Sequence, residues 1–266
     1  MLPFTRADLR EDLRALGIVP GDVVMVHASL RAIGPVLGGP DSVIAAILDA
    51  ASPAGTLLCY TDWHADYEDL RDERGELPPA LRPHVPPFVP EASRAARYLG
   101  SLGELVRTYP EALRSGNPGA SCAAVGARAA WLTAEHVLDF GYGPASPFGK
   151  LVTCGGKVLM LGAPLDTMTL LHHAEHLAQI PGKRLVRTEV PLQGAGGAVW
   201  REIEEFDTSD PVVSGLADTY FSDIVEAFLA TGRGHTGTVG RAPSVLVPAA
   251  EIVAFAVAWL ETHFGA

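Results

Sequence analysis

The stretch Val158-Leu159-Met160-Leu161-Gly162-Ala163-Pro164 decides the fold of this chain, and the segment Leu170-Leu171-His172-His173-Ala174-Glu175-His176 follows it closely. A short apolar run that ends in a glycine and proline turn is typical of a buried strand, and the segment after it predicts a helix reaching about Gln179. The chemistry of α/β proteins usually lies at the rim where strands end and helices begin. A histidine at that rim can accept a proton near neutral pH. The stretch therefore predicts an α/β fold with a functional imidazole at the sheet edge.

The rest of the chain continues this alternation of strands and helices. Apolar runs predict strands at 23–26, 55–60, 121–125, 157–161 and 244–247. Amphipathic periodicity predicts helices at 5–16, 41–51 with Asp41 as the cap, 101–109, 127–133, 222–230 and 249–264. An antiparallel pair is expected at 184–192 and 198–206 around a glycine turn. With no internal repeat and no visible boundary, we expect one domain over residues 1–266, interrupted by a long acidic, proline-rich loop at 62–90 of the kind that carries function.

Composition excludes several classes of protein. Although 48% of residues are apolar, no apolar run approaches the roughly 18 residues that cross a bilayer, so no membrane span is predicted. Residues 1–14 alternate arginine with acidic residues and lack the apolar stretch of a secretory signal, so we expect a cytoplasmic protein. The cysteines Cys59, Cys122 and Cys154 have no short paired spacing, so the sequence predicts neither a metal site nor a disulfide framework.

The net charge of -11 argues against a nucleic-acid partner, which needs basic groups to neutralise phosphates. Acidic residues crowd two segments, 62–76 and 202–210. Such residues are usually only solvated, but two acidic clusters around one cleft would create a field that attracts a polycation. The charge distribution thus favours a cationic partner.

At this point a family resemblance is visible in ordered segments along nearly the whole chain. These segments are Met25-Val26-His27-Ala28-Ser29-Leu30-Arg31-Ala32-Ile33-Gly34-Pro35-Val36-Leu37-Gly38-Gly39, Pro86-Pro87-Phe88, Arg114-Ser115-Gly116-Asn117-Pro118, Asp139-Phe140-Gly141-Tyr142-Gly143, 161–167, 169–175 and the tail 259–265. The chain resembles the aminoglycoside 3-N-acetyltransferases. The resemblance implies a three-layer α/β/α fold with a mixed central sheet, whose strand order the sequence leaves open. It also implies transfer of an acetyl group from acetyl-CoA to the 3-amino group of the 2-deoxystreptamine ring of an aminoglycoside, conferring antibiotic resistance without a metal. Whether the chain forms a homodimer stays open.

The resemblance assigns the general base to His172. A substrate amine arrives largely as ammonium, so a base must remove a proton as the nitrogen attacks the thioester. His173 is then expected to pack or to contact ligand, and His176, one turn beyond His172, to be structural. Glu175 is expected to share the face of His172 and either to bind the substrate amine or to hold neighbouring backbone.

The family also pairs its histidine with a carboxylate that orients the ring. Here Ser222 stands where relatives carry glutamate, and Asp223 follows it. We expect Asp223 to orient His172, with Asp207, Glu226 or a water molecule as the alternatives.

The resemblance assigns acetyl-CoA to two segments, with the contact residues His27, Ala28, Ser29, Leu30, Arg31, Ile33, Gly34, Arg114, Ser115 and Asn117. A small-residue loop that follows a strand and opens a helix can offer backbone N–H groups, and here the Ser29 hydroxyl, to a pyrophosphate. Ser29 as a nucleophile that forms an acyl-enzyme is the alternative. It lacks the flanking-glycine elbow that exposes nucleophilic serines.

Carboxylates and aromatic faces are expected to hold the ammonium groups and sugar rings of the antibiotic. The candidates are Tyr60, Trp63, Asp66, Glu68, Asp69, Glu204, Asp207 and Asp210. Tyr60 and Trp63 fit equally well as core residues at a strand end. Val89 stands where relatives often carry aspartate, which predicts a different substrate range. Two rival functions remain: acetylation of another amine, which would make the acidic loops dispensable, and a catalytically silent protein that binds CoA or polycations.

Overall fold

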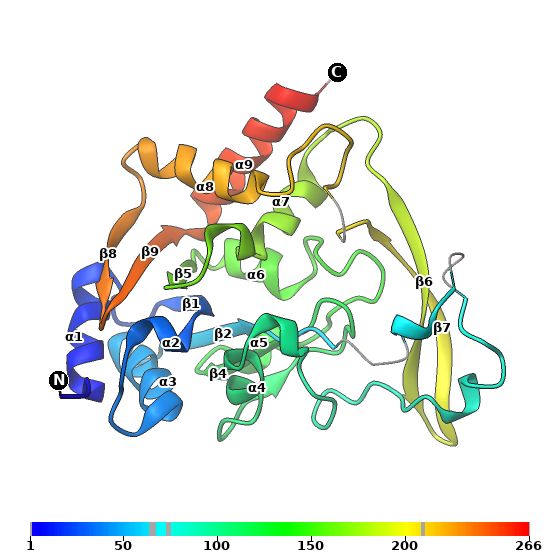
Figure 1. Cartoon of the computed structure of the whole chain (residues 1–266), viewed down its shortest axis with the longest axis horizontal. Coiled ribbons are helices and arrows are strands. Elements are labelled where there is room, and N and C mark those ends of the chain that lie inside the picture. The colour runs from blue at the N-terminus through cyan, green and yellow to red at the C-terminus, as the bar shows by residue number, and fades with distance from the viewer. Residues whose placement is uncertain (1, 64–67, 73–75, 209–210, 266) are drawn as a thin grey trace.

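The strand predicted at 157–161 is β5 (Lys157–Leu161), and it lies inside a seven-stranded sheet with the order β3-β4-β2-β1-β5-β9-β8. The computed structural model describes residues 2–63, 68–72, 76–208 and 211–265. The central strands β1 (Val23–Ala28), β2 (Thr56–Tyr60) and β5 are parallel. The outer strands are antiparallel to their neighbours, namely β3 (Leu113–Arg114), β4 (Cys122–Gly126), β8 (His235–Val239) and β9 (Ala242–Pro248). The sheet is therefore mixed, as expected (Figure 1).

Helices cover both faces of this sheet. One face carries α1 (Arg6–Leu16), α2 (Leu30–Ile33), α3 (Gly39–Ala50) and α4 (Leu102–Arg107). The other carries α5 (Ala129–Thr133), α6 (Pro147–Thr153), α7 (Leu170–Leu177), α8 (Tyr220–Ala230) and α9 (Ala249–Phe264). Successive residues of a strand point to opposite faces of the sheet. Val24 and Val26 of β1 therefore pack in the core under α1–α4, and Val23 and Met25 pack in the core under α5–α9. This arrangement confirms the three-layer α/β/α fold.

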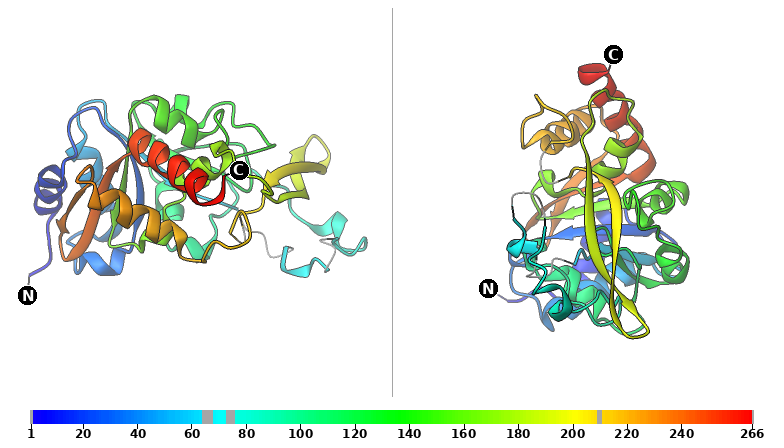
Figure 2. Two further views of the ribbon diagram at one scale, coloured as in Figure 1. Left: turned by 90° about the horizontal axis from the view of Figure 1, so that it is seen from above. Right: turned by 90° about the vertical axis from the view of Figure 1, so that its right-hand side faces the viewer.

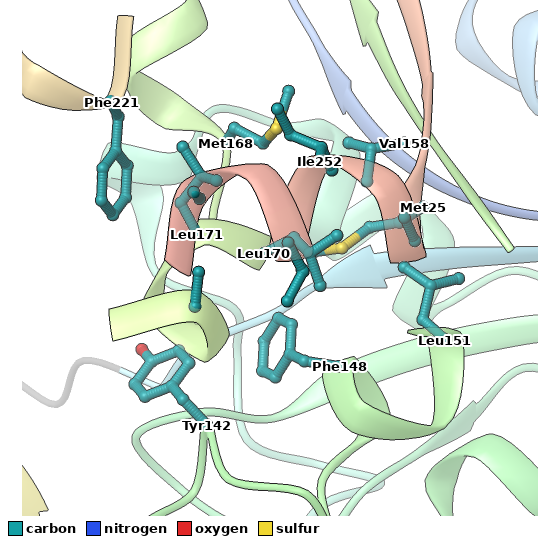
Figure 3. Packing of buried hydrophobic residues seen from close by; sticks show 14 of the residues in the cluster. Met25, Tyr142, Phe148, Leu151, Val158, Met168, Leu170, Leu171, Phe221 and Ile252 are labelled. Atoms are coloured by element: carbon teal, nitrogen blue, oxygen red, sulfur yellow. The ribbon is translucent and has the colours of Figure 1, made fainter. Parts of the chain in front are cut away.

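The histidine helix α7 is anchored by its apolar side. Leu170 and Leu171 are almost fully buried and pack in the cluster that includes Phe148 and Ile252 (Figure 3). Burying a leucine side chain contributes about 1.5–3 kcal/mol. Since the two leucines directly precede His172, their burial fixes the backbone that carries the histidine.

A long two-stranded ribbon, β6 (Leu185–Gly194) with β7 (Gly197–Phe206), stands apart from the central sheet (Figures 1 and 2). Segment 62–90 contains the 3-10 turns η1 (Glu68–Leu70) and η2 (Arg82–His84), and Arg71 and Arg82 bond to Glu189 of the ribbon. A separate apolar cluster joins Trp63, Leu77, Val85 and Phe88 to Leu192 and Trp200 of the ribbon. The acidic loop is thus partly ordered by a small core of its own.

Some elements differ from the sequence prediction. Helix α3 begins at Gly39 with Gly38 as its N-cap, so Asp41 lies inside the first turn instead of capping it. Helix α7 ends at Leu177, because Ala178 adopts an extended backbone. Strand β8 escaped prediction, since four of its five residues are exposed and it shows no apolar alternation. The glycine-containing helix α6 was also missed. Within the described ranges, no helix combines the length and the apolarity that spanning a membrane requires.

Candidate active site

A cavity of about 590 Å³ opens at the carboxyl ends of the parallel strands. Its floor comes from Val26 to Ser29 at the end of β1 and from Cys59 and Tyr60 at the end of β2. Its walls come from the segments around the helices, namely Tyr98, Leu99, Gly100, Leu102, Gly103, Tyr142, Ala163, Pro164, Asp166, Thr167, Thr169, His172, Thr208 and Phe221. The carboxyl ends of parallel strands are where open α/β sheets bind ligands. The cavity is therefore the candidate site on topological grounds as well.

His172 lies in the wall of this cavity with one nitrogen already engaged. Its Nδ1 atom lies 2.6 Å from Oε2 of Glu175, whose side chain is only 3% exposed. A carboxylate accepts hydrogen bonds, so this contact places the ring proton on Nδ1 and leaves Nε2 with a lone pair. The rings of Tyr142 and Phe221 lie 5.0 and 4.9 Å from the imidazole and limit its rotation. The arrangement fixes the orientation of this imidazole in the cavity wall.

Asp223, the carboxylate expected to orient His172, is exposed on α8, and the contact to the ring comes from Glu175 instead. Helix geometry gives the reason. Phe221 points from α8 toward the imidazole, and a residue two positions further on lies about 200° around the helix axis, on the solvent side. Of the two side chains among the alternatives, Glu226 is also exposed, and Asp207 is bonded to Arg184 at 3.2 Å.

The neighbouring histidines are packing residues in this structure. His173 is 3% exposed, and its Nδ1 lies 2.6 Å from the Tyr142 carbonyl oxygen, which makes Nδ1 the donor. His176 packs between the rings of Phe140 and Phe206 at 5.7 and 5.4 Å. Burial lowers the pKa of both imidazoles, which favours their neutral forms.

The predicted acetyl-CoA residues of the first segment divide into two groups. His27, Ala28 and Ser29 line the cavity, whereas Leu30, Arg31, Ile33 and Gly34 belong to the α2 turn and do not line its described wall. Ile33 is fully buried in the core. Burial lowers the pKa of His27 to about 4, so this imidazole is neutral near pH 7.

The polar side chains of the second predicted segment, 114–117, form hydrogen bonds within the protein. Arg114 donates to the backbone oxygens of Thr61 and Ser93 and to Ser121 Oγ. Ser115 and Asn117 are buried and bond to backbone groups, with Ser115 also contacting His136. None of these three lines the described wall of the cavity. Their polar groups are thus engaged within the protein, and their contact with acetyl-CoA stays a prediction.

The predicted antibiotic contacts are also only partly brought together. Tyr60 lines the cavity, and its hydroxyl lies 2.8 Å from that of Tyr142. Trp63 is buried against Phe88, with ring centroids 5.3 Å apart, in the loop cluster. Four of the predicted acids lie off the described cavity wall: Glu68 and Asp69 in η1, Glu204 paired with Arg187, and Asp207 paired with Arg184. Asp66 and Asp210 lie outside the described residues.

Other acids, absent from the predicted set, lie near the cavity. Asp166 lines it, and Asp62, which is 9% exposed, accepts a hydrogen bond from the cavity residue Tyr98. Burial raises the pKa of Glu205 to about 7, although backbone N–H groups of Phe206, Gly141 and Tyr142 and the charge of His172 act in the opposite direction. Glu205 therefore lies close to the imidazole. Glu204 and Glu205 are successive residues of β7, so their side chains point to opposite faces of the ribbon. Only the placement of the ribbon shows which of the two faces the cavity.

Comparison with known proteins decides the family. The sequence pattern of the family described as aminoglycoside 3-N-acetyltransferase matches residues 25–261. The chain belongs to that family. This acyltransferase is 46% identical to aminoglycoside N(3)-acetyltransferase III of Pseudomonas aeruginosa over 268 residues, covering 99% of this chain and 96% of the relative. It is 44% identical to aminoglycoside N(3)-acetyltransferase VIII of Streptomyces fradiae, covering 99% and 94% of the two chains.

Solved structures agree with the sequence relatives. The structure described as AAC-IIIb binary with CoASH superimposes on this acetyltransferase with a TM-score of 0.96 at 60% identity, covering 98% of this chain and 97% of the other. The structure described as AAC-VIa bound to sisomicin has a TM-score of 0.93 at 36% identity, covering 100% of both chains. Among the described residues of the acetyltransferase, no three His, Cys, Asp or Glu side chains are grouped as a metal ion would require.

Proposed function

We propose that this acetyltransferase moves the acetyl group of acetyl-CoA directly to the 3-amino nitrogen of the 2-deoxystreptamine ring of an aminoglycoside, in a ternary complex with His172 as the general base. One observation carries the proposal: the imidazole in the cavity wall has its Nδ1 bonded to a buried carboxylate. Such a ring can take a proton on Nε2 while Glu175 stabilises the positive charge that forms.

The proposed reaction balances without any further reactant. The ammonium first releases one proton to solvent, and the neutral amine nitrogen then attacks the thioester carbonyl carbon. The new C–N bond forms, and the C–S bond breaks. The proton leaving the nitrogen passes to His172 Nε2 and then to the departing thiolate, which gives free CoA thiol and the acetylated amine. Glu175 keeps Nδ1 protonated throughout. Nε2 is therefore the nitrogen that both accepts the proton and returns it.

The end of β1 is the proposed site of the acetyl donor. His27, Ala28 and Ser29 line the cavity there, and a solved relative was crystallised with CoASH. The neutral His27 adds no charge that would repel or attract the thioester end. The Ser29 backbone N–H is already bonded to Leu161 O at 3.0 Å, which leaves the hydroxyl as the donor that this residue offers to a ligand.

For the antibiotic, we assign Asp166, which lines the cavity, together with Asp62, which accepts a hydrogen bond from the cavity residue Tyr98, and Glu205, on which the charge of His172 acts. Tyr60 is the proposed aromatic contact. Carboxylates bind ammonium groups through charge-assisted hydrogen bonds, and relatives have been solved with sisomicin and with a gentamicin. An ammonium close to Glu205 would favour ionisation of this carboxyl, whose pKa burial raises to about 7. The cytoplasmic location and a homodimer stay predictions.

A thiol-release assay with acetyl-CoA and a panel of aminoglycosides tests the proposal, and NMR of the product locates the acetyl group. We expect turnover with at least some of the panel and acetylation at the 3-amino nitrogen. Turnover only with other amines would support the rival acetyltransferase, and binding of acetyl-CoA without turnover would support the silent protein.

The acyl-enzyme alternative through Ser29 has its own test. Acid quench of the enzyme mixed with acetyl-CoA alone, followed by mass spectrometry, should show unmodified protein under direct transfer. An adduct of one acetyl group on Ser29, lost in Ser29→Ala, would establish the covalent route and overturn direct transfer.

A further inference from the structure

Both carboxylate oxygens of Glu175 are engaged by described side chains. Oε2 faces His172 Nδ1, and Oε1 accepts a hydrogen bond from the hydroxyl of Tyr220, the first residue of α8. The glutamate side chain is 3% exposed, so little solvent reaches it to replace a lost partner. A buried carboxylate needs donors on both oxygens, because an unsatisfied buried charge is unfavourable. The tyrosine supplies the second donor.

Tyr220 is fixed by its surroundings and lies off the described cavity wall. The residue is 6% exposed, and its ring packs edge-on against Phe221 at 4.6 Å. Burial, followed by the charge of Glu175, raises the pKa of its hydroxyl, so the phenol stays protonated and acts as a donor. A backbone hydrogen bond from Val212 also reaches the tyrosine oxygen. The hydroxyl is thus held between the chain after β7 and the catalytic helix.

We propose that Tyr220 is a positioning residue for acetyl transfer: its O–H holds the Glu175 carboxylate in the orientation that keeps His172 facing the cavity. The inference rests on the proposed role of His172 as the base. Tyr220 acts only through Glu175. The tyrosine hydrogen bond also stabilises part of the negative charge of Glu175. The carboxylate then attracts the imidazole proton less strongly, and the ring stays available as a base.

Other charged groups also face this pair. Glu205 on β7 acts on His172, and Lys183, which donates to the backbone oxygens of Glu175 and His176, lies near the glutamate. His173 and His176 belong to the same helix and are buried beside it. Replacing the tyrosine hydroxyl leaves all of these groups in place, so a change of the pH profile reports on the Tyr220 hydrogen bond.

The test uses Tyr220→Phe, which keeps the ring and removes only the hydroxyl. We expect kcat to fall about tenfold, the effect of one charge-assisted hydrogen bond, with KM for both substrates within about twofold. The acidic limb of the pH–rate profile should move to higher pH, because the histidine–glutamate pair then binds its proton more tightly. Tyr109→Phe, in the core cluster on the other face of the sheet, is the matched control and should leave the profile unchanged.

A double variant separates positioning from general packing. If the tyrosine acts through the carboxylate, Tyr220→Phe should slow Glu175→Gln by less than about twofold, because the effects of coupled residues do not add. The proposal would be overturned if the fold-losses of kcat in the two single variants multiplied in the double variant. It would also be overturned if Tyr220→Phe lowered kcat without moving the pH–rate profile. NMR titration of the ring nitrogens of the His172–Glu175 pair gives a readout without substrate. If the wild type acetylates nothing while the titration midpoint still shifts in Tyr220→Phe, the proposed function fails and the positioning contact stands.

Discussion

The Nδ1 atom of His172 and the Oε2 atom of Glu175 lie 2.6 Å apart within one turn of α7. Residues at i and i+3 of a helix are neighbours, so no second element is needed to supply the carboxylate. The tertiary structure adds the burial of Glu175 and the rings of Tyr142 and Phe221 around the imidazole. The imidazole and its carboxylate partner therefore both come from α7, and groups on other elements hold the pair in place.

His172→Ala should lower kcat by about 10²–10⁴, the usual contribution of a general base, while the affinities for acetyl-CoA and aminoglycoside stay within a few-fold. Steady-state thiol release gives kcat, and calorimetry gives the two affinities. His235→Ala, at an exposed position of the edge strand β8, is the matched control and should behave as the wild type. Unchanged turnover in His172→Ala would remove the assignment of the base.

The sequence predicts a histidine where the structure has His172 in the cavity wall, but it places the carboxylate partner of this ring on the wrong helix. The role of His172 as the general base stays a prediction. Strand β5 and the helix after it could be predicted, because a buried strand appears in the sequence as a short apolar run and a half-buried helix as apolar residues at helical spacing. The family pattern predicts the partner of His172 on α8 at Asp223, although the spacing also predicts that Glu175 shares the face of the histidine. Which side of α8 faces the imidazole depends on the packing of Phe221, which local sequence does not reveal.

The same limit applies to the polar residues around the cavity. The family resemblance assigns Arg114, Ser115 and Asn117 to acetyl-CoA, but in the structure their polar atoms form hydrogen bonds to other groups of the protein. Conversely, Glu205 and Asp62 stand inside acidic runs whose sequence does not distinguish solvated members from inward-facing ones. Their separation from Glu204 and Glu68 depends on how the β6–β7 ribbon and the loop dock onto the sheet. That docking is a long-range contact without a local signature.

Glu175→Gln and Asp223→Asn distinguish the two candidate carboxylates. Glu175→Gln should lower kcat by about 10²–10⁴, because an amide neither supports the imidazolium nor enforces the Nδ1 tautomer. Asp223→Asn should stay within about twofold of the wild type, as expected for an exposed side chain away from the ring. Both are measured as kcat with saturating substrates, and the two substitutions make the same chemical change. A larger loss in Asp223→Asn than in Glu175→Gln would restore the expectation drawn from the sequence.

Asn117→Ala tests whether the 114–117 segment is structural. Asn117 makes four hydrogen bonds, to Val137 O, Leu138 O and the N–H groups of Gly119 and Ala120. Its loss leaves buried backbone groups unpaired and should lower the free energy of unfolding by about 2–4 kcal/mol. Urea unfolding measures that loss, and KM for acetyl-CoA should change by less than about twofold if the residue does not touch the cosubstrate. A tenfold rise of this KM with little loss of stability would instead support the predicted contact.

His136 should make folding stability fall in acid. Its ring bridges Ser115 Oγ at 2.8 Å and Gly141 O at 2.7 Å, and burial is the main cause that lowers its pKa from 6.5 to about 4. Between these values the unfolded chain binds a proton that the folded chain does not. The free energy of unfolding should therefore fall by about 1.4 kcal/mol per pH unit over this range, and the stability gained from keeping the ring neutral is fully present only above about pH 6.5. His27 acts in the same direction, since burial also lowers its pKa to about 4.

The comparison of wild type with His136→Gln isolates the share of this one residue, because His27 is present in both. Urea unfolding between about pH 7 and pH 5 should show the two stabilities converging by roughly 2 kcal/mol as the pH falls, since only the wild type carries the proton linkage of residue 136. The direction follows from the geometry: Gly141 O can only accept, so Nε2 carries the proton of the neutral ring, and a second proton on Nδ1 requires the Ser115 hydroxyl to turn away. Stability curves that stay parallel across this range would mean that His136 takes up its proton in the folded protein as easily as in the unfolded chain.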